Sequence, residues 1–381
     1  MVCRVFTLCE IRILKNMDYM KLKIFLSVAI MFFTLSGCKK IEPKKTEHSS
    51  FTHAETNSVY YWKTVLDLDS NDYDLIEDLN IGRIYLRMFD VDIDIDYFSK
   101  KDRTIPVGTL RIPNDTYHVY QEKMKSVSFV PVVYITLDAL KESKDKEETL
   151  AKNIVERVKN MCSYNNVPNV KGLQLDCDWT ATTEESFFKL CEKVRYYIQK
   201  ENMPWELSST IRLHQLSKKA PPVDYGVLMV YNTGNFSDPD EKNSIISEET
   251  VNPYLKNLKD YPIHLDVAYP TYSWQLLFRK RQFIGLLNAI ELSDSTSFSS
   301  KSENQYVALK DIPYNGKTIF KGDIVKQENS KYKDILEIKN EIENILIGKT
   351  HSNILYHFDA KNLNNYTHAQ LKSLLKNNQN N

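Results

Sequence analysis

The sequence predicts an α/β fold, a (β/α)8 TIM-type barrel, and three observations support this prediction. Eight segments rich in β-forming residues recur along the chain. Amphipathic helical patterns separate several of these segments, an alternation that indicates parallel βα units. The eight segments span about 300 residues, a length typical of a barrel with insertions. We therefore expect one folded domain over residues 58–375.

The expected strands are short runs of β-branched, aromatic and aliphatic residues, which favour extended structure. They cover residues 58–63, 81–88, 128–136, 172–180, 205–213, 225–231, 263–269 and 353–358. The expected helices carry apolar residues near helical spacing, which predicts one buried face on each. They cover residues 72–79, 146–161, 184–199 and 332–347. Strands and helices therefore alternate through most of the domain.

The segment between the seventh and eighth strands is too long for a single helix. Two β-rich runs flank Asn315-Gly316, a dipeptide that favours the tight turn of a β-hairpin. We expect a β-hairpin insertion at about residues 302–328, ahead of the last long helix. The Asn/Gln-rich residues 376–381 are expected to form a disordered tail.

The N-terminus predicts secretion and attachment to a lipid. Lysines precede an apolar run that is too short for a confident membrane span, and Leu35-Ser36-Gly37-Cys38 then resembles a bacterial lipobox. We expect a signal peptide over residues 1–37, with translation starting at Met17 or Met20, and a lipid such as palmitate on Cys38. An ordinary cleaved signal peptide is the alternative. The polar residues 38–57 predict a flexible tether to a membrane of the bacterial cell envelope, on its periplasmic face or at the cell surface.

Composition excludes several other classes of protein. The chain has 50 Lys and Arg against 50 Asp and Glu, so it lacks the basic excess that binds nucleic acid. Of the six cysteines, Cys3 and Cys9 precede the expected cleavage and Cys38 would carry the lipid. Cys162, Cys177 and Cys191 remain, an odd, scattered set that does not predict a disulfide framework. Nothing in the sequence indicates a metal or an organic cofactor, and we expect a monomer. The aspartates of residues 90–96 resemble the start of a calcium loop but lack its Gly and distal Glu, so a solvated strand extension is the other interpretation.

The fourth expected strand carries the clearest candidate site. Its side chains alternate between two faces, so Gln174, Asp176, Asp178 and Thr180 share the polar face. Two carboxylates on one buried strand are unfavourable unless they are paired or used. The strand therefore predicts either a catalytic or ligand-binding site, or a structural carboxylate pair satisfied by a neighbouring Arg.

Polar residues near the ends of other strands would converge on the same end of the barrel, where active sites of such barrels lie. The fifth strand adds Arg212 and His214, and either of them would lie near Asp178 and permit a charge-assisted pair. The remaining candidates of this kind are Lys63, Arg87, Asp90, His264, Asp266, His357 and Asp359. For each of these residues alone, a structural role remains the alternative.

Three short segments resemble glycoside hydrolase family 18, the chitinase family. Asp176-Cys177-Asp178-Trp179-Thr180 is similar to the end of its fourth-strand motif D-x-x-D-x-D-x-E, Met229-Val230-Tyr231-Asn232 to its M-x-Y-D, and Val267-Ala268-Tyr269-Pro270-Thr271-Tyr272 to a seventh-strand segment. The resemblance implies a TIM barrel with a sugar-binding pocket. It also departs from the family, because the catalytic Glu falls on Thr180, the first Asp on Leu173, and Asn232 stands where Asp is usual. A Thr hydroxyl cannot protonate a leaving oxygen as a carboxyl group of raised pKa does. The fourth-strand pattern also resembles lipoproteins of Bacteroidota-type bacteria.

Three functions remain open from the sequence. The first is a glycoside hydrolase-like envelope lipoprotein that acts on a glycan through two carboxylates, with Asp176, Asp178 and Asp266 as the candidate catalytic residues. The candidate substrate-binding residues are Lys63, Arg87, Asp90, Arg212, His214, Tyr231, Asn232, Tyr269, Trp274, His357 and Asp359. The second is a glycan-binding or scaffold lipoprotein that has lost the catalytic acid. The third is a hydrolase of another bond class that uses the His and Asp pairs.

Overall fold

A computed structural model describes residues 54–96, 101–113, 120–288 and 290–377 of the 381-residue chain. The expected signal peptide, Cys38 and the tether as far as residue 53 lie outside the described residues. Within the described ranges, no helix combines the length and the apolar character that crossing a membrane requires.

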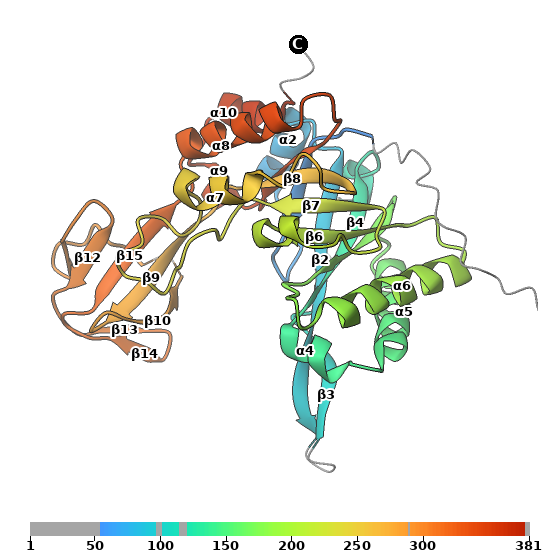
Figure 1. The fold of residues 1–381 in the computed structure, drawn as a ribbon. Helices are drawn as coiled ribbons and strands as arrows, with labels where there is room; N and C mark the ends of the chain where they lie inside the picture. The colour runs from blue at the N-terminus through green and yellow to red at the C-terminus, as the bar shows by residue number, and fades with distance from the viewer. Residues whose placement is uncertain (1–53, 97–100, 114–119, 289, 378–381) are drawn as a thin grey trace, which may run out of the picture. The chain divides into compact units, whose positions relative to one another are not determined.

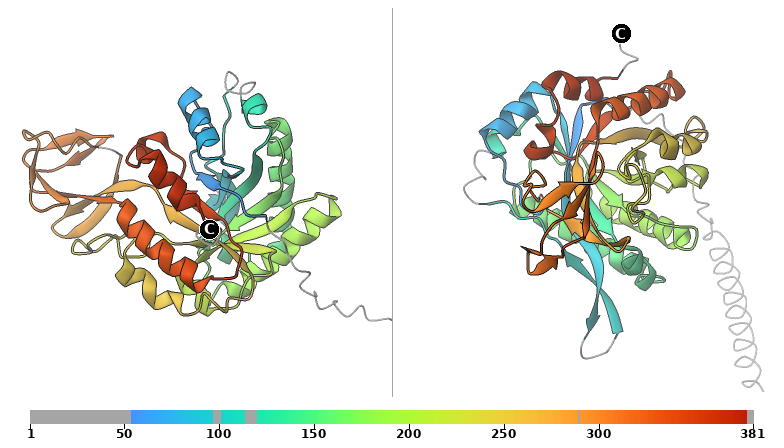
Figure 2. Two further views of the ribbon diagram at one scale, coloured as in Figure 1. Left: turned by 90° about the horizontal axis from the view of Figure 1, so that it is seen from above. Right: turned by 90° about the vertical axis from the view of Figure 1, so that its left-hand side faces the viewer.

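Eight parallel strands close into a barrel, as the sequence predicts. Around the ring they are β1 (Ser58–Tyr61), β16 (Asn353–Tyr356), β8 (His264–Pro270), β7 (Tyr225–Met229), β6 (Glu206–Arg212), β5 (Gly172–Asp176), β4 (Ser128–Ile135) and β2 (Arg83–Asp96). The ring closes where β1 pairs with β2, with Ser58 opposite Arg83. Helices surround the strands, as Figures 1 and 2 show.

Helices cover the outside of the barrel because each presents an apolar face to the strands. They are α2 (Ser70–Asp78), α4 (Leu137–Glu142), α5 (Glu147–Tyr164), α6 (Glu184–Lys200), the 3-10 turn η1 (Leu213–Ser217), α7 (Glu248–Leu255), α8 (Tyr332–Ile345), α9 (Ala360–Leu363) and α10 (His368–Leu375). Helix α6, for example, buries Phe187, Leu190 and Val194 in one core with the strands. Local signals fix some helix starts: Asp69 and Asp72 form a capping box at α2.

Side-chain alternation along β5 separates two cores. Leu173 and Leu175 point outward into the core under the helices, where Trp179 also stacks on Phe187 at a centroid distance of 6.2 Å. Gln174, on the other face, accepts a hydrogen bond of 2.6 Å from the Tyr60 hydroxyl. The interior of the barrel is therefore filled by polar and aromatic side chains. The ladder of β5 ends at Asp176, so the expected strand over 172–180 is too long, although the alternation of buried side chains continues past it.

The alternating aspartates of residues 90–96 form a strand extension. β2 continues beyond the barrel and pairs antiparallel with β3 (Lys101–Val107), with Asp90 opposite Val107. Asp94 lies 3.3 Å from the Arg103 guanidinium across this ribbon. In the part of the chain that the structure describes, no group of three or more His, Cys, Asp or Glu side chains is arranged to hold a metal ion.

The insertion between β8 and β16 is larger than a hairpin. A five-stranded sheet is formed by β10 (Gln282–Leu287), β9 (Ser273–Arg279), β15 (Ile324–Asn329), β12 (Gln305–Ala308) and β11 (Phe298–Ser300), and Figure 1 shows it beside the barrel. A hairpin of β13 (Ile312–Tyr314) and β14 (Lys317–Ile319) has Asn315 and Gly316 at its turn, both with positive φ. The predicted extent of 302–328 is thus wrong. The turn between β9 and β10 is Lys280-Arg281, and both residues have positive φ. Because neither is Gly or Asn, the sequence gives no sign of this turn.

The C-terminal tail also begins later than predicted. Asn377 is buried, and its side-chain amide donates to the backbone oxygen of His351 at 3.3 Å. The backbone oxygen of Lys376 accepts a hydrogen bond from Asn353. Residues 376 and 377 therefore pack against the barrel, while residues 378–381 lie outside the described part.

Candidate functional site

The candidate site lies at the C-terminal ends of the barrel strands. Asp176 is the last residue of β5 and Asp178 follows two residues later. Arg212 is the last residue of β6, and Tyr231 follows β7 by two residues. Because β5, β6 and β7 are adjacent and parallel, these side chains meet at one end of the barrel.

Arg212 binds both carboxylates of the fourth-strand motif. Its Nε contacts Asp178 Oδ1, and its Nη2 lies 3.1 Å from Asp176 Oδ1. Asp176 also accepts a hydrogen bond of 2.6 Å from the Thr210 hydroxyl. The structure thus contains the predicted Asp178–Arg212 pair, and it adds Asp176 as a second partner.

Burial sets the electrostatics of this triad. Burial raises the pKa of Asp176, and the nearby Arg212 guanidinium only partly opposes this effect. Burial would lower the pKa of Arg212, but Asp176 and Asp178 outweigh it, so that pKa is raised and the guanidinium stays charged. Tyr134, on β4, has its pKa raised to about 12, first by burial and then by Asp178 and Asp176. One permanent cation therefore faces two carboxylates and a neutral phenol.

A pocket of about 260 Å³ opens beside Arg212. It is lined by Asp178, Arg212, Leu213, His214, Met229, Tyr231, Asn232, Thr233 and Tyr254. Partial desolvation lowers the pKa of His214, which favours the neutral imidazole at pH 7. The pocket therefore offers a charged group, hydrogen-bonding groups and an aromatic ring to a small polar ligand.

Aromatic rings form much of the remaining surface of the barrel mouth. Tyr231 and Tyr356 stack at a centroid distance of 4.2 Å, and Tyr272 lies 5.9 Å from Tyr356. Trp62 is 5.7 Å from Tyr356 and carries the Arg87 guanidinium over its ring at 5.5 Å. Trp62 and Tyr356 were not among the predicted site residues, and Tyr272 was included only within a motif. Alternation along the first and last strands could have revealed both.

Most of the other residues expected at the mouth form ion pairs or hydrogen bonds with near neighbours. Lys63 Nζ lies 2.9 Å from Asp359 Oδ2, and Arg87 binds Asp90 through both Nε and Nη2. Asn232 has a φ of 54° and accepts a hydrogen bond from the Tyr272 hydroxyl. His357 follows β16, where burial lowers the pKa of its imidazole.

Asp266 does not belong to this site, contrary to the sequence prediction. It lies near the start of β8, where it accepts from the backbone N–H of Ser352 at 2.7 Å and lies 3.1 Å from His264 Nε2. Arg83, the first residue of β2, is 3.9 Å away. These contacts place Asp266 and His264 at the N-terminal ends of the strands, opposite the mouth. Asp266 therefore cannot face Asp178 across a bound sugar.

Two predicted stacking residues also have different positions. Tyr269 is fully buried on the outer face of β8, in the core under the helices, so it cannot contact a ligand. Trp274 lies on β9 of the insertion, where it is partly exposed and 5.7 Å from the Tyr272 ring. Trp274 thus extends the aromatic surface of the mouth, whereas Tyr269 stabilises the barrel.

Thr180 occupies the position of the family's catalytic Glu without replacing its chemistry. It is exposed in the segment after β5, and its hydroxyl lies 3.0 Å from that of Thr182. The 260 Å³ pocket does not include it. The carboxyl groups at the C-terminal end of β5 are those of Asp176 and Asp178.

Comparison with known proteins supports the fold. No protein-family model and no curated protein matches the chain. Among solved structures, the chain is similar to the spore cortex-lytic enzyme SleL of Bacillus cereus, with 12% identity, 86% of this chain and 75% of that chain covered, and a TM-score of 0.51. SleL of Bacillus megaterium also matches, with 11% identity, 85% of this chain and 76% of that chain covered, and a TM-score of 0.48. The GH18 chitinase ChiB of Flavobacterium johnsoniae matches with 11% identity, 85% of this chain and 93% of that chain covered, and a TM-score of 0.47. The protein therefore has a TIM-barrel fold similar to that of SleL.

Proposed function

We propose that the barrel mouth binds a glycan without hydrolysing it. The observation that carries this proposal is the placement of Arg212, which binds both carboxyl groups of the fourth-strand motif, together with Thr180 at the position that the resemblance aligns with the acid. A general acid must release its proton to the leaving oxygen in the transition state. Thr180 carries no carboxyl group, and at Asp176 the Arg212 guanidinium opposes, although it does not cancel, the effect of burial that raises the pKa.

Glycan binding is supported by the surroundings of the triad. Sugars combine apolar C–H faces with many hydroxyl groups, so their sites pair flat rings with charged and amide groups. The mouth provides Trp62, Tyr231 and Tyr272 as rings, and Asp178 and Arg212 as hydrogen-bonding groups. Aromatic pairs contribute roughly 0.5–1.5 kcal/mol beyond their buried area.

Hydrolysis is the second candidate function, and the raised pKa of Asp176 favours it. Burial can tune a carboxyl group toward neutral pH, where it acts as an acid. Asp178 would then stabilise positive charge that develops on the sugar ring. A ligand that displaces Arg212 from Asp176 would raise this pKa further, because the guanidinium favours the ionised form.

The cell-envelope location is part of the proposal. It depends on Cys38 and the lipobox-like segment before it. One acyl chain gives only marginal membrane binding, whereas several chains anchor a protein firmly. A lipid-anchored barrel on such a tether would present its mouth to glycans of the envelope.

The test is a glycan array followed by titration calorimetry and a reducing-sugar assay on each ligand found. We expect binding without turnover, about tenfold weaker binding by Trp62→Ala because one stacking ring is lost, and unchanged affinity for Tyr269→Phe, whose ring is buried outside the barrel. Thr180→Ala should also bind normally. Binding of no glycan by the wild type would reject the proposal. Turnover that Asp176→Asn abolishes would establish the second candidate instead.

A further inference from the structure

We propose that Glu328 of the insertion is a positioning residue, which holds Trp274 and the loop after β7 together as one wall of the glycan site. This loop covers residues 230–247 and is called the β7–α7 loop below. The inference rests on the proposed function, because it assigns a task in ligand binding to the insertion.

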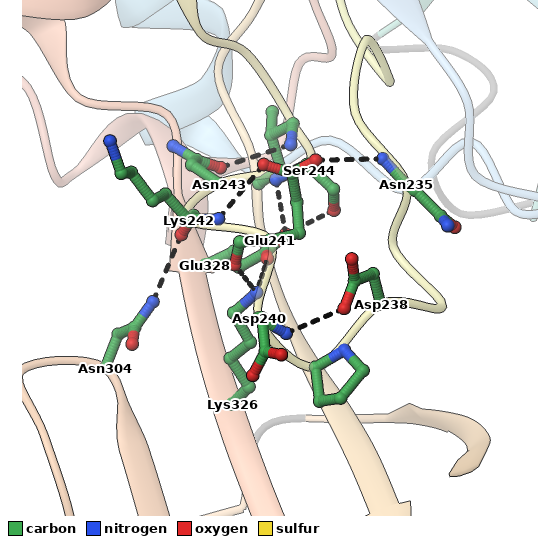
Figure 3. A network of polar contacts seen from close by, with 12 residues as sticks. Asn235, Asp238, Asp240, Glu241, Lys242, Asn243, Ser244, Asn304, Lys326 and Glu328 are labelled. Atoms are coloured by element: carbon green, nitrogen blue, oxygen red, sulfur yellow. Dashed lines mark hydrogen bonds and ion pairs between the residues drawn. The ribbon is translucent and has the colours of Figure 1, made fainter. Parts of the chain in front are cut away.

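Glu328 joins two parts of the chain through one carboxylate. It is 2% exposed, and its Oε2 accepts hydrogen bonds from Trp274 Nε1 at 2.8 Å and from the backbone N–H of Ser244 at 3.1 Å. The Ser244 hydroxyl donates to the same oxygen. Figure 3 shows the Ser244 contacts from the β7–α7 loop above Glu328. The indole and the loop therefore share a single acceptor.

Lys326 completes the arrangement from the same strand. Its Nζ lies 2.7 Å from Glu328 Oε1 and donates to the backbone oxygen of Glu241 in the β7–α7 loop. Lys326 is 1% exposed, so both charges are buried. Replacing a buried ion pair by apolar residues of similar size is often neutral or stabilising. Stability alone therefore does not explain the pair, whereas its directional hydrogen bonds fix Trp274 and Ser244 in place.

The residues held by Glu328 continue the aromatic surface of the mouth. Trp274 lies edge-on to Tyr272 at 5.7 Å and to Phe236, a β7–α7 loop residue that is 42% exposed, at 6.1 Å. Tyr272 in turn lies 5.9 Å from Tyr356 in the barrel. A line of ring contacts thus leads from the barrel to the insertion, and Glu328 fixes the orientation of its outer part.

Surface contacts between the insertion and the loop surround this buried centre. Asn243 donates to the backbone oxygen of Asn329 at 3.0 Å. Asn304 donates to the backbone oxygen of Lys242 at 3.3 Å, a contact drawn in Figure 3. Neither contact touches Trp274 through its side chain. They can keep the loop near the sheet, but the orientation of the indole depends on Glu328.

The decisive variant is Lys326→Met with Glu328→Leu, which removes both buried charges and the acceptor together. Lys326→Met with Glu328→Gln is the conservative variant, because the amide keeps one acceptor oxygen and no buried charge is left unpaired. Asp323→Asn is the matched control: Asp323 is 3% exposed in the same insertion and binds Arg279 at 2.8 and 3.0 Å, with no contact to Trp274. The full chain is used for every variant.

Three readouts separate positioning from folding. The indole N–H resonance of Trp274, assigned with Trp274→Phe, reports its acceptor, and hydrogen exchange of the Ser244 amide reports the loop. The affinity for the glycan found by the array reports the site. We expect Lys326→Met with Glu328→Leu to shift the resonance, speed exchange and weaken binding about tenfold. Lys326→Met with Glu328→Gln should stay close to the wild type in all three readouts. Asp323→Asn should lower the melting temperature and leave all three readouts unchanged.

Two outcomes would overturn the inference. One is an unchanged Trp274 resonance and Ser244 exchange rate in Lys326→Met with Glu328→Leu. The other is a loss of affinity in Asp323→Asn as large as in that variant, which would mean that any weakening of the insertion suffices. If the wild type binds no glycan, the proposed function fails, and the assigned role of Glu328 in binding fails with it. The resonance and exchange data would then still decide whether Glu328 holds the wall.

Discussion

Arg212→Ala should destabilise the barrel through Asp176 more than through Asp178. The Asp176 side chain is 5% exposed, so it loses its countercharge in a site with little access to water. The Asp178 side chain is 46% exposed and can be solvated in the variant. Exposed ion pairs contribute about 0–1 kcal/mol, whereas removing one partner of a buried pair costs about 3–5 kcal/mol.

This free energy corresponds to a measurable change in melting temperature. The entropy of unfolding is about 2.1 cal/mol/K per residue, so a domain of roughly 330 residues loses about 1.5 °C for each kcal/mol. Arg212→Ala should therefore melt about 4–7 °C below the wild type. Arg212→Lys keeps a charge and should lie between the two proteins. Calorimetry or circular dichroism measures the order.

The loss should also depend on pH, because Asp176 can take up a proton. Burial raises the pKa of Asp176 in the folded state, and without Arg212 that pKa rises further. The folded pKa of Asp176 then lies above its unfolded value of about 3.9. The contribution of Asp176 to the free energy of unfolding is therefore fully present below about pH 3.9 and is lost as the pH rises through the folded pKa. The two melting temperatures should therefore approach each other near pH 4 and separate toward pH 8.

A second substitution tests whether the unpaired Asp176 causes the loss of stability. Asp176→Asn in the Arg212→Ala background removes the unpaired charge and retains an oxygen that can accept from Thr210, so it should restore much of the lost stability. Equal melting temperatures for wild type, Arg212→Ala and Arg212→Lys would refute the pairing argument. A deficit that does not change between pH 4 and pH 8 would refute the role of Asp176.

Two further predictions concern other parts of the chain. Cys38→Ala should lose firm membrane association, and mass spectrometry of the wild type should find an acylated N-terminal Cys38; an unmodified mature N-terminus at another residue would contradict lipidation. Asp266→Asn should lower the stability by roughly 3–5 kcal/mol, because buried Arg83 loses its countercharge, yet glycan affinity should stay that of the wild type because Asp266 lies at the far end of the barrel. A loss of affinity in folded Asp266→Asn would show that the two ends of the barrel are coupled.

The sequence was sufficient for the barrel because segments rich in β-forming residues, buried on both faces in β5 and β7, alternate with amphipathic helices. The alternation of apolar and polar residue types overextended the fourth strand, because Cys177 and Trp179 are buried although the ladder ends at Asp176. Alternation reports which face is covered, and a residue beyond the last hydrogen bond can still be covered by a helix. For this reason the strand was recognised while its end was not.

The position of a site residue could be predicted where the sequence showed both which side of the sheet its side chain faces and how far along the strand it lies. Arg212 and Asp178 come at strand ends, so their pairing followed from the order of the strands. Asp266 faces the barrel interior as predicted, but it lies near the N-terminal end of β8, which begins only two residues earlier. Tyr269 has the opposite parity to Asp266, so alternation alone could have excluded it from the barrel interior. The position of Trp274 depends on an insertion whose extent no local signal indicates.

The closure of the barrel has a consequence for how the chain acquires its structure. β16, near the C-terminus, fills the gap between β1 and β8, with Ser58 opposite Ile354 and Tyr269 opposite Leu355. Until residues 353–356 have been synthesised, two strand edges at the gap have no native partner, and such edges promote association between chains. Pairings between distant segments also form slowly, because a long loop must close first. The nascent chain therefore exposes open edges through most of its synthesis, while the strands of the insertion can pair with near neighbours.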